Sequence, residues 1–372
     1  PCPPQSFDKA GSPASEIREL WAQQKLNFED AWQFTRGEGV KVAVIDSGVD
    51  STHPQLSNVK QTLDETGTGP QDCIGHGTKV AGIIGAQDVR SSKQIPFFGV
   101  APGAEIISIK FAVSSDNNDS SLVPKAIRKA VDLGAKVINL SIQGPASADL
   151  LSAVRYAHSR DVVIVAAAGN LSGTPGDEPQ PVYPAEYENG VISVGAIGPD
   201  GQLAEDVSNT VTRVDLTAPG KDIISTFPQP RGSYGGDTGT SFAVPYVAGT
   251  AALVRAHNPT WTYLQVRQAI IGTADGGTVK GTGAGLVNPL RAVTSPLSAT
   301  GGKVPPAPAS GRRVPILQPE PEDRFGRLLA LSITGGALTV ALVVAVICVV
   351  VPEGRRRGWQ PNRRTTPRPP AA

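Results

Sequence analysis

The sequence contains no methionine, and it lacks the charged and then apolar amino-terminal stretch that marks an export signal. Because translation starts at methionine, we interpret Pro1 as a mature or trimmed end from which an export signal has been removed. The formal net charge is only +1, and the globular part has no basic stripe. These absences exclude nucleic acid as an expected partner. The sequence also shows no internal repeat.

Length and composition predict one large domain with appendages. The chain has 372 residues, of which 40% are hydrophobic, so it can bury a sizeable core. Apolar runs typical of buried strands alternate with helical periodicity, which predicts a mostly parallel sheet covered by helices on both faces. The expected strands are 42–45, 104–109, 137–140 and 162–168, and the expected helices lie within 17–32, 121–134, 147–157 and 243–253.

Asp46 stands at the end of the apolar run 42–45, which predicts a buried parallel strand. A turn of Ser47, Gly48 and Val49 follows. We therefore expect the carboxylate at the carboxyl edge of the sheet, where open α/β folds place their sites. For an isolated aspartate in this position, a helix cap or a ribose contact is the alternative interpretation.

A histidine and a serine each precede a predicted helix of small apolar residues. His76 lies within the segment 75–78, and Ser241 follows Gly239 by two positions. Taken singly, His76 could be a structural histidine and Ser241 an N-cap. Together with Asp46 they supply the nucleophile, the base and the orienting group of a serine hydrolase, in the order Asp, His, Ser.

Asn170 follows the predicted strand 162–168 and is a candidate donor to an oxyanion. Attack on a carbonyl creates negative charge on oxygen, which preorganised donors must meet. The Asn170 side-chain amide and the backbone N–H of Ser241, at a helix N-terminus, are suitable groups. A turn residue in the left-handed conformation is the alternative interpretation of Asn170.

Four blocks of the sequence together resemble the subtilisin-like serine proteases (peptidase family S8). The blocks are Asp46-Ser47-Gly48, His76-Gly77-Thr78, Ala168-Gly169-Asn170 and Gly239-Thr240-Ser241. Secondary matches such as 99–102 and 217–220 extend the likeness over residues 15–297. Phe242 and Tyr246 stand where the commoner pattern has Met and His, which indicates a subfamily.

The resemblance implies an α/β, subtilisin-like three-layer fold with a mostly parallel central sheet, and a peptidase domain over 15–297. It implies a polypeptide substrate and hydrolysis by Asp46, His76 and Ser241, with Asn170 in the oxyanion hole. It also implies two segments that flank an extended substrate as added strands would. These segments contribute Ser141, Ile142, Gln143, Gly144, Ala168 and Gly169.

No cofactor or catalytic metal is expected. Subtilisin-like folds often bind calcium, but the loop carboxylates of this chain lack a convincing ligand spacing. We interpret them as solvated loop acids and leave structural calcium undecided. They are Asp64, Glu65, Asp116 and Asp119.

Residues 328–351 form a stretch of 24 residues without a charge. As a helix it would extend about 36 Å, compared with a hydrocarbon core of about 30 Å, so we predict a transmembrane helix rather than a very hydrophobic buried one. The basic tail 352–372 is then cytoplasmic by the positive-inside rule, and the peptidase domain is extracytoplasmic. The proline-rich segment 298–327 between them is expected to be a semi-rigid linker.

The three cysteines fit an oxidising compartment. Cys2 and Cys73 are expected to form a disulfide, with two free thiols as the alternative, while Cys348 lies in the predicted span. The disulfide would tether the extension 1–14 near His76. Because only 45 residues precede Asp46, we interpret this extension as a strap rather than a separate inhibitory domain.

This combination of an exported subtilase, a short tethered extension, a proline-rich stalk, one span and a basic tail resembles the mycosins. These are membrane-anchored proteases of actinobacterial type VII secretion systems. The resemblance implies a secretion membrane complex as partner. It leaves two alternatives to a selective processing enzyme: a mainly structural component of that complex, and a general degradative protease tethered at the surface.

Overall fold

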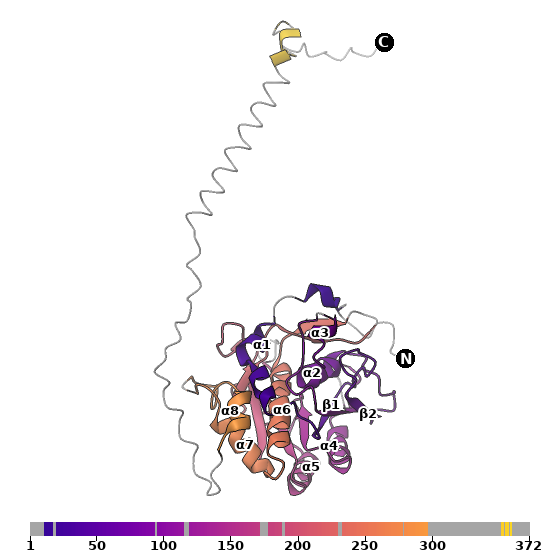
Figure 1. Cartoon of the computed structure of the whole chain (residues 1–372), viewed down its shortest axis with the longest axis vertical. Coiled ribbons are helices and arrows are strands. Elements are labelled where there is room, and N and C mark those ends of the chain that lie inside the picture. Colours follow the sequence, from indigo (N-terminus) through magenta and orange to yellow (C-terminus); the bar gives the residue numbers. More distant parts are fainter. Residues whose placement is uncertain are drawn as a thin grey trace, which may run out of the picture. The chain divides into compact units, whose positions relative to one another are not determined.

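Figure 1 shows a computed structural model of the chain. It describes residues 11–17, 20–93, 95–114, 119–171, 178–187, 190–229, 233–277, 279–296, 351–352, 354–356 and 358. The chain divides into two units, 1–307 and 308–372, and the elements below belong to the first.

A sheet of seven strands forms the centre of the first unit, in the order β2-β3-β1-β4-β5-β6-β7. Every neighbouring pair is parallel. The strands are β1 (Lys41–Asp46), β2 (Val59–Asp64), β3 (Glu105–Lys110), β4 (Val137–Leu140), β5 (Val163–Ala167), β6 (Val191–Ile197) and β7 (Leu216–Pro219). The predicted parallel sheet is thus confirmed.

Alternate residues of the central strands face two different hydrophobic cores. In β1, Val42 and Val44 belong to one core, whereas Ala43 and Ile45 belong to the other. Because successive side chains of a strand point to opposite faces, both faces of the sheet are covered. This explains why the strand reads as a continuous apolar run rather than as an alternating pattern.

Helices cover both faces and complete a three-layer α/β fold (Figure 1). α4 (Leu122–Asp132) and α5 (Ala148–Ser159) pack together on one side. On the other side, α6 (Thr240–His257) contacts α2 (His76–Gly85), α7 (Tyr263–Gly272) and α8 (Pro289–Thr294). The described part of this unit also contains α1 (Trp21–Leu26) and α3 (Arg90–Lys93), with 3₁₀ turns at Ala14–Glu16 and Phe28–Gln33.

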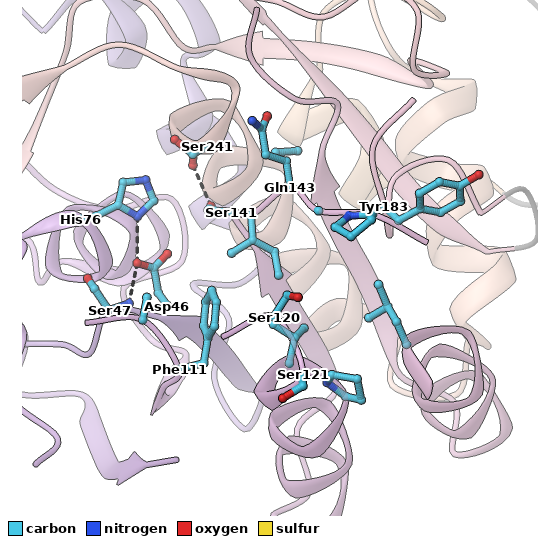
Figure 2. A pocket seen from close by; sticks show the side chains of 18 of the residues that line it. Asp46, Ser47, His76, Phe111, Ser120, Ser121, Ser141, Gln143, Tyr183 and Ser241 are labelled. Carbon is cyan, nitrogen blue, oxygen red and sulfur yellow. Dashed lines mark hydrogen bonds and ion pairs between the residues drawn. The ribbon is translucent and has the colours of Figure 1, made fainter. Parts of the chain in front are cut away.

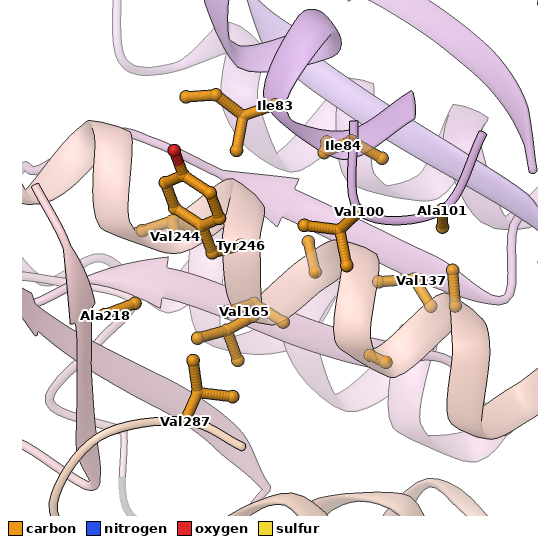
Figure 3. Packing of buried hydrophobic residues seen from close by; sticks show 14 of the residues in the cluster. Ile83, Ile84, Val100, Ala101, Val137, Val165, Ala218, Val244, Tyr246 and Val287 are labelled. Atoms are coloured by element: carbon orange, nitrogen blue, oxygen red, sulfur yellow. The ribbon is translucent and has the colours of Figure 1, made fainter. Parts of the chain in front are cut away.

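α6 is the central helix of the larger core, and its residues from Thr240 to Arg255 are buried. Figure 3 shows Val244 and Tyr246 of α6 among side chains from α2 and from the sheet, including Ile83 and Val165. A helix that is apolar all round must be enclosed on all sides. This burial holds the amino end of α6, which carries Ser241, against the sheet.

The predicted helices and strands occur close to their expected bounds. At α5 the Ser147 side chain accepts a hydrogen bond from the Leu150 N–H, so it is the N-cap. Three strands of the sheet, β2, β6 and β7, were not predicted. Of these, β2 is an edge strand of largely half-exposed residues that form no apolar run.

A short antiparallel pair, β8 (Ile223–Thr226) and β9 (Tyr234–Asp237), lies beside α2. The amino-terminal segment adds to this pair, because the Ser12 N–H donates to the Tyr234 carbonyl at 2.7 Å. Ile17 and Tyr234 then bury their side chains in one small apolar cluster with Phe97. Residues 12–17 are therefore integrated into the domain by pairing and by packing.

Most of the carboxy-terminal predictions fall outside the described residues. These are the linker 298–327, the transmembrane helix 328–351 apart from Val351, and most of the tail 352–372. In the part of the chain that the structure describes, no helix is long and apolar enough to cross a membrane.

Candidate active site

A cavity of about 590 Å³ opens at the carboxyl ends of β1, β4 and β5 (Figure 2). Its wall includes four residues singled out from the sequence, Asp46, His76, Asn170 and Ser241. The predicted substrate-binding residues Ser141, Ile142, Gln143 and Gly144 also line it, whereas Ala168 and Gly169 do not. Residues from four distant segments thus meet where the parallel strands end, as expected for an open α/β sheet.

Asp46 and His76 are joined by a hydrogen bond. Asp46 ends β1 with its side chain buried, and His76 is the first residue of α2. His76 Nδ1 lies 2.8 Å from Asp46 Oδ1, which also accepts the Ser47 N–H at 2.7 Å. Because a carboxylate only accepts, Nδ1 carries the proton and Nε2 keeps its lone pair. His76 is therefore held as the tautomer that can accept a proton at Nε2.

Asp46 also changes the basicity of His76. Burial favours the neutral imidazole, but the negative charge and hydrogen bond of Asp46 outweigh burial, with help from Asp237 and Asp72, and the pKa of His76 is raised. The His76 side chain remains 26% exposed. It can therefore exchange a proton with a molecule in the cavity.

Ser241 lies in the first turn of α6, one residue before Phe242, whose ring centroid is 5.1 Å from that of His76. His76 and Ser241 line the same cavity. Among the described residues, no direct hydrogen bond joins His76 Nε2 to Ser241 Oγ. Catalytic hydrogen bonds are often long in a free enzyme and shorten when substrate binds. The backbone N–H of Ser241 is one of the first-turn donors that have no acceptor inside the helix.

Asn170 faces this end of α6 with a fixed orientation. Its Oδ1 accepts two hydrogen bonds from Thr240, from the N–H at 2.8 Å and from Oγ1 at 2.9 Å. Because Oδ1 faces Thr240, Asn170 Nδ2 points away from the Thr240 N–H and hydroxyl. A methyl group built on Gly239 would lie 3.2 Å from Asn170 Nδ2 and 3.1 Å from Ser241 Oγ. The space that Gly239 leaves empty is thus bordered by both groups, as an oxyanion site requires.

A buried carboxylate that the sequence analysis missed supports the start of α2. Asp72 Oδ1 accepts from Ser47 Oγ at 2.8 Å and from the Gly75 N–H at 2.7 Å. Its Oδ2 accepts from the Thr78 N–H at 2.8 Å and from Thr78 Oγ1 at 2.6 Å. Burial raises the pKa of Asp72 despite these hydrogen bonds. Asp72 therefore connects the turn after Asp46 with the first turn of the helix that bears His76.

An ion pair of Lys79 and Asp237 lies next to His76 along α2. Lys79, one turn along α2 from His76, is nearly buried and forms a 2.7 Å ion pair with Asp237 at the end of β9. Its ammonium also lies 5.2 Å from the ring centroid of Phe227 and 5.7 Å from that of Phe242. The Asp237 carboxylate and the two aromatic rings therefore hold the Lys79 ammonium in place, and one of these rings, that of Phe242, belongs to the helix that carries Ser241.

Some remaining predictions can be compared with the structure. Cys73 is assigned to a disulfide, whereas Cys2 is outside the described residues, so their pairing stays a prediction. Asp64 accepts hydrogen bonds from Thr66 and Gly69, and Glu65 pairs with Lys125. Within the described ranges no three His, Cys, Asp or Glu residues form a group that could hold a metal ion.

Comparisons with known proteins agree with this geometry. Residues 37–290 match the model of the subtilase family (Peptidase S8). Subtilisin E of Bacillus subtilis is 42% identical over 242 residues, which cover 64% of this chain and 61% of subtilisin E. The chain thus spans less than two thirds of that relative's length. Mycosin-4 of Mycobacterium tuberculosis is 37% identical, with 87% of this chain and 80% of mycosin-4 covered.

Solved structures show the same similarity. The MycP3 protease from the type VII (ESX-3) secretion system superposes with a TM-score of 0.61 at 34% identity, covering 77% of this chain and 91% of that one. A chain of the periplasmic assembly from the ESX-5 inner membrane complex gives a TM-score of 0.66 at 29% identity, covering 86% and 99%. These matches confirm the resemblance inferred from the four sequence blocks.

Proposed function

The chain belongs to the subtilase family, and from this premise we propose that it is a serine endopeptidase that uses Asp46, His76 and Ser241. One observation carries the proposal: His76 Nδ1 is bound at 2.8 Å to Asp46 Oδ1 in the cavity that Ser241 also lines. A serine hydroxyl needs such an oriented base to become a nucleophile at neutral pH.

In the proposed mechanism, His76 Nε2 takes the proton of Ser241 Oγ while Oγ attacks the scissile carbonyl carbon. Asp46 holds the imidazole and stabilises the positive charge that develops on it. The carbonyl oxygen becomes an oxyanion between Asn170 Nδ2 and the Ser241 N–H. His76 then protonates the leaving amine, and water, deprotonated by His76, hydrolyses the acyl-enzyme. No step requires a metal or cofactor.

The test is cleavage of a peptide library by the full chain and by Ser241→Ala. We expect Ser241→Ala to remove cleavage and covalent labelling by a fluorophosphonate, which reacts with activated serines. Ser159→Ala, which alters an exposed serine at the end of α5, is the matched control and keeps both properties. Cleavage by Ser241→Ala at the rate of the parent would refute the assignment.

We further propose that the protein is a membrane-anchored, extracytoplasmic mycosin of a type VII secretion system. The similarity to mycosin-4 and to MycP3 supports this subfamily, and the uncharged stretch 328–351 supports the anchor. The expected localisation is a single-pass membrane protein with a cytoplasmic carboxyl terminus. An externally added protease should then digest the peptidase domain of intact spheroplasts but spare a tag placed after residue 372.

A second candidate function is a structural role in the secretion complex with proteolysis secondary. It is favoured by the similarity to a chain of the ESX-5 periplasmic assembly, which covers 86% of this chain. Secretion in cells that carry Ser241→Ala, compared with cells that lack the gene, separates the two. Rescue by the inactive protein supports the structural role, whereas failure of Ser241→Ala to rescue supports processing.

The third alternative, a general degradative protease tethered at the surface, is tested by the peptide library. Broad cleavage across the library would indicate this function.

A further inference from the structure

The side chain of Gln143 crosses the gap between two loops of the cavity. Gln143 follows β4 and Asn170 follows β5, which are neighbouring strands. Gln143 Oε1 accepts a 2.7 Å hydrogen bond from the backbone N–H of Asn170. Figure 2 shows the Gln143 side chain between Ser241 and Tyr183. The carboxamide therefore bridges the two segments that are predicted to flank a substrate.

Gly169 gives this carboxamide its room. Its φ of +96° lies in the left-handed region that favours glycine. A methyl group built there would lie 3.0 Å from Gln143 Oε1 and 2.8 Å from Val182 Cγ2. Gln143 and Val182 thus pack over the backbone of Gly169. This explains why the predicted binding residue Gly169 does not line the cavity.

The segment of Val182 and Tyr183 is hydrogen-bonded to the loop that carries Gln143. The Tyr183 N–H donates to the Gly144 carbonyl at 2.9 Å, which holds the segment of Val182 beside the loop that carries Gln143. Val182 also donates its N–H to Thr212 Oγ1 at 3.0 Å. The backbone of Val182 and Tyr183 is thus held by the loop of Gly144 and by Thr212. This segment cannot move away from the loop that carries Gln143 without the loss of these hydrogen bonds.

The residue that supplies the scissile carbonyl, P1, is the one whose side chain we place in the gap between these two loops. The attacked carbon lies next to Ser241 Oγ, and its oxygen points to Asn170 Nδ2. Its third substituent is the P1 Cα, and because segments 141–144 and 168–169 are predicted to flank the substrate, we place the P1 side chain between loop 141–144 and loop 168–170. The Gln143 carboxamide already spans these two loops, so it limits the size of the P1 side chain.

We propose that Gln143 is a size filter that restricts P1 to small side chains such as those of Gly, Ala and Ser. This inference rests on the proposed peptidase function and adds a substrate class to it. An aromatic or long P1 side chain would have to displace the carboxamide and leave the Asn170 N–H without its acceptor. Even one methylene group more or less in a hydrophobic pocket changes kcat/KM by about 10- to 200-fold.

The test compares two peptides that differ only at P1, one with Ala and one with Phe, as substrates of the full chain. We expect the parent to prefer Ala by at least about 10-fold in kcat/KM. Gln143→Gly should raise the Phe-to-Ala ratio by at least about 10-fold, and Gln143→Ala should shift it in the same direction. Gln143→Glu keeps the length and the acceptor, and should keep the ratio of the parent. Gln202→Ala, an exposed glutamine after β6, is the matched control.

The outcomes separate this inference from the function on which it rests. A parent that accepts Phe as well as Ala, or an unchanged ratio in Gln143→Gly, overturns the size filter if Ser241→Ala still removes cleavage. Failure of the parent to cleave either peptide in a Ser241-dependent way overturns both proposals. Thermal unfolding and fluorophosphonate labelling of each variant establish that a changed ratio comes from a folded site.

Discussion

The hydroxyl of Ser141 donates a 2.7 Å hydrogen bond to the backbone carbonyl of Ser241. In a regular helix that carbonyl would receive the N–H of the residue four positions later, but this residue is Pro245, which has no N–H. Asn139 Nδ2 donates to Ser141 Oγ at 2.9 Å, which leaves the hydroxyl proton for Ser241. The end of β4 is thereby joined directly to the residue proposed as nucleophile.

Ser141→Ala should destabilise the domain and lower kcat. The Ser241 carbonyl would be left buried without its partner, which costs about 1–3 kcal/mol. Thermal unfolding and kcat on a peptide substrate measure the two effects. Ser159→Ala removes the same type of bond, from Oγ to the Tyr156 carbonyl at 2.7 Å, but in an exposed position. Equal losses in the two variants would contradict the special role of the buried bond.

Asn170→Ala should lower kcat by about 10²- to 10³-fold with little change in KM, because an oxyanion donor acts mainly in the transition state. Steady-state kinetics on one peptide give both parameters. Gly239→Ala should act in the same direction, since its methyl group would enter the space between Asn170 Nδ2 and Ser241 Oγ. If Asn170→Ala raised KM alone, the side chain would bind the ground state rather than the oxyanion.

Asp237→Asn should shift the acid limb of kcat/KM to lower pH. The base must be neutral, so activity is lost as pH falls through the pKa of His76, and Asp237 helps to raise that pKa. Without this charge the pKa of His76 falls, and the unpaired Lys79 ammonium acts in the same direction. The shift should shrink in high salt.

The control for this pH profile is Asp200→Asn, which changes an exposed carboxylate after β6. It should leave the acid limb where it is. An acid limb that moves to higher pH in Asp237→Asn, or that moves equally in both variants, would contradict the assignment of Asp237 as a charge that acts on His76.

Asp72→Asn should lower both stability and kcat through the position of His76. An amide keeps one acceptor but replaces the other by a donor, which faces either the Thr78 N–H or the Gly75 N–H. Loss of a hydrogen bond to a charged group costs about 1.5–3 kcal/mol. Fluorophosphonate labelling should slow in the folded variant, as judged by circular dichroism. A variant with a lower melting temperature but unchanged labelling would make Asp72 purely structural.

Much of the fold and of the site was predictable, because local patterns determine it. Apolar runs marked the central strands. Asp46 ends a strand and Asn170 follows one, while His76 and Ser241 lie in the first turn of a helix. Parallel strands bring such residues together whatever their separation in sequence. The missed Asp72 did have a signal, since it is a carboxylate four residues before the helix that begins at His76.

The contact between Gln143 and Asn170 was not predictable in this way. It depends on how Val182 packs over Gly169, and Val182 belongs to a segment outside the four sequence blocks. Likewise, the ion pair of Lys79 with Asp237 joins residues 158 positions apart through β9, a strand without an apolar run. Side-chain bridges between loops follow from tertiary packing, which sequence periodicity does not encode.

The pairing of Ser12 with Tyr234 has a consequence for truncated forms of the chain. Ser12 accepts from the Tyr234 N–H at 3.1 Å as well as donating to its carbonyl, so it satisfies both backbone polar groups of Tyr234, the first residue of β9. A form trimmed past this residue would present those groups to solvent beside the apolar side chain of Phe97. Such a bare margin recruits strands from other molecules, and we expect the trimmed protein to aggregate at concentrations at which the full chain stays monodisperse.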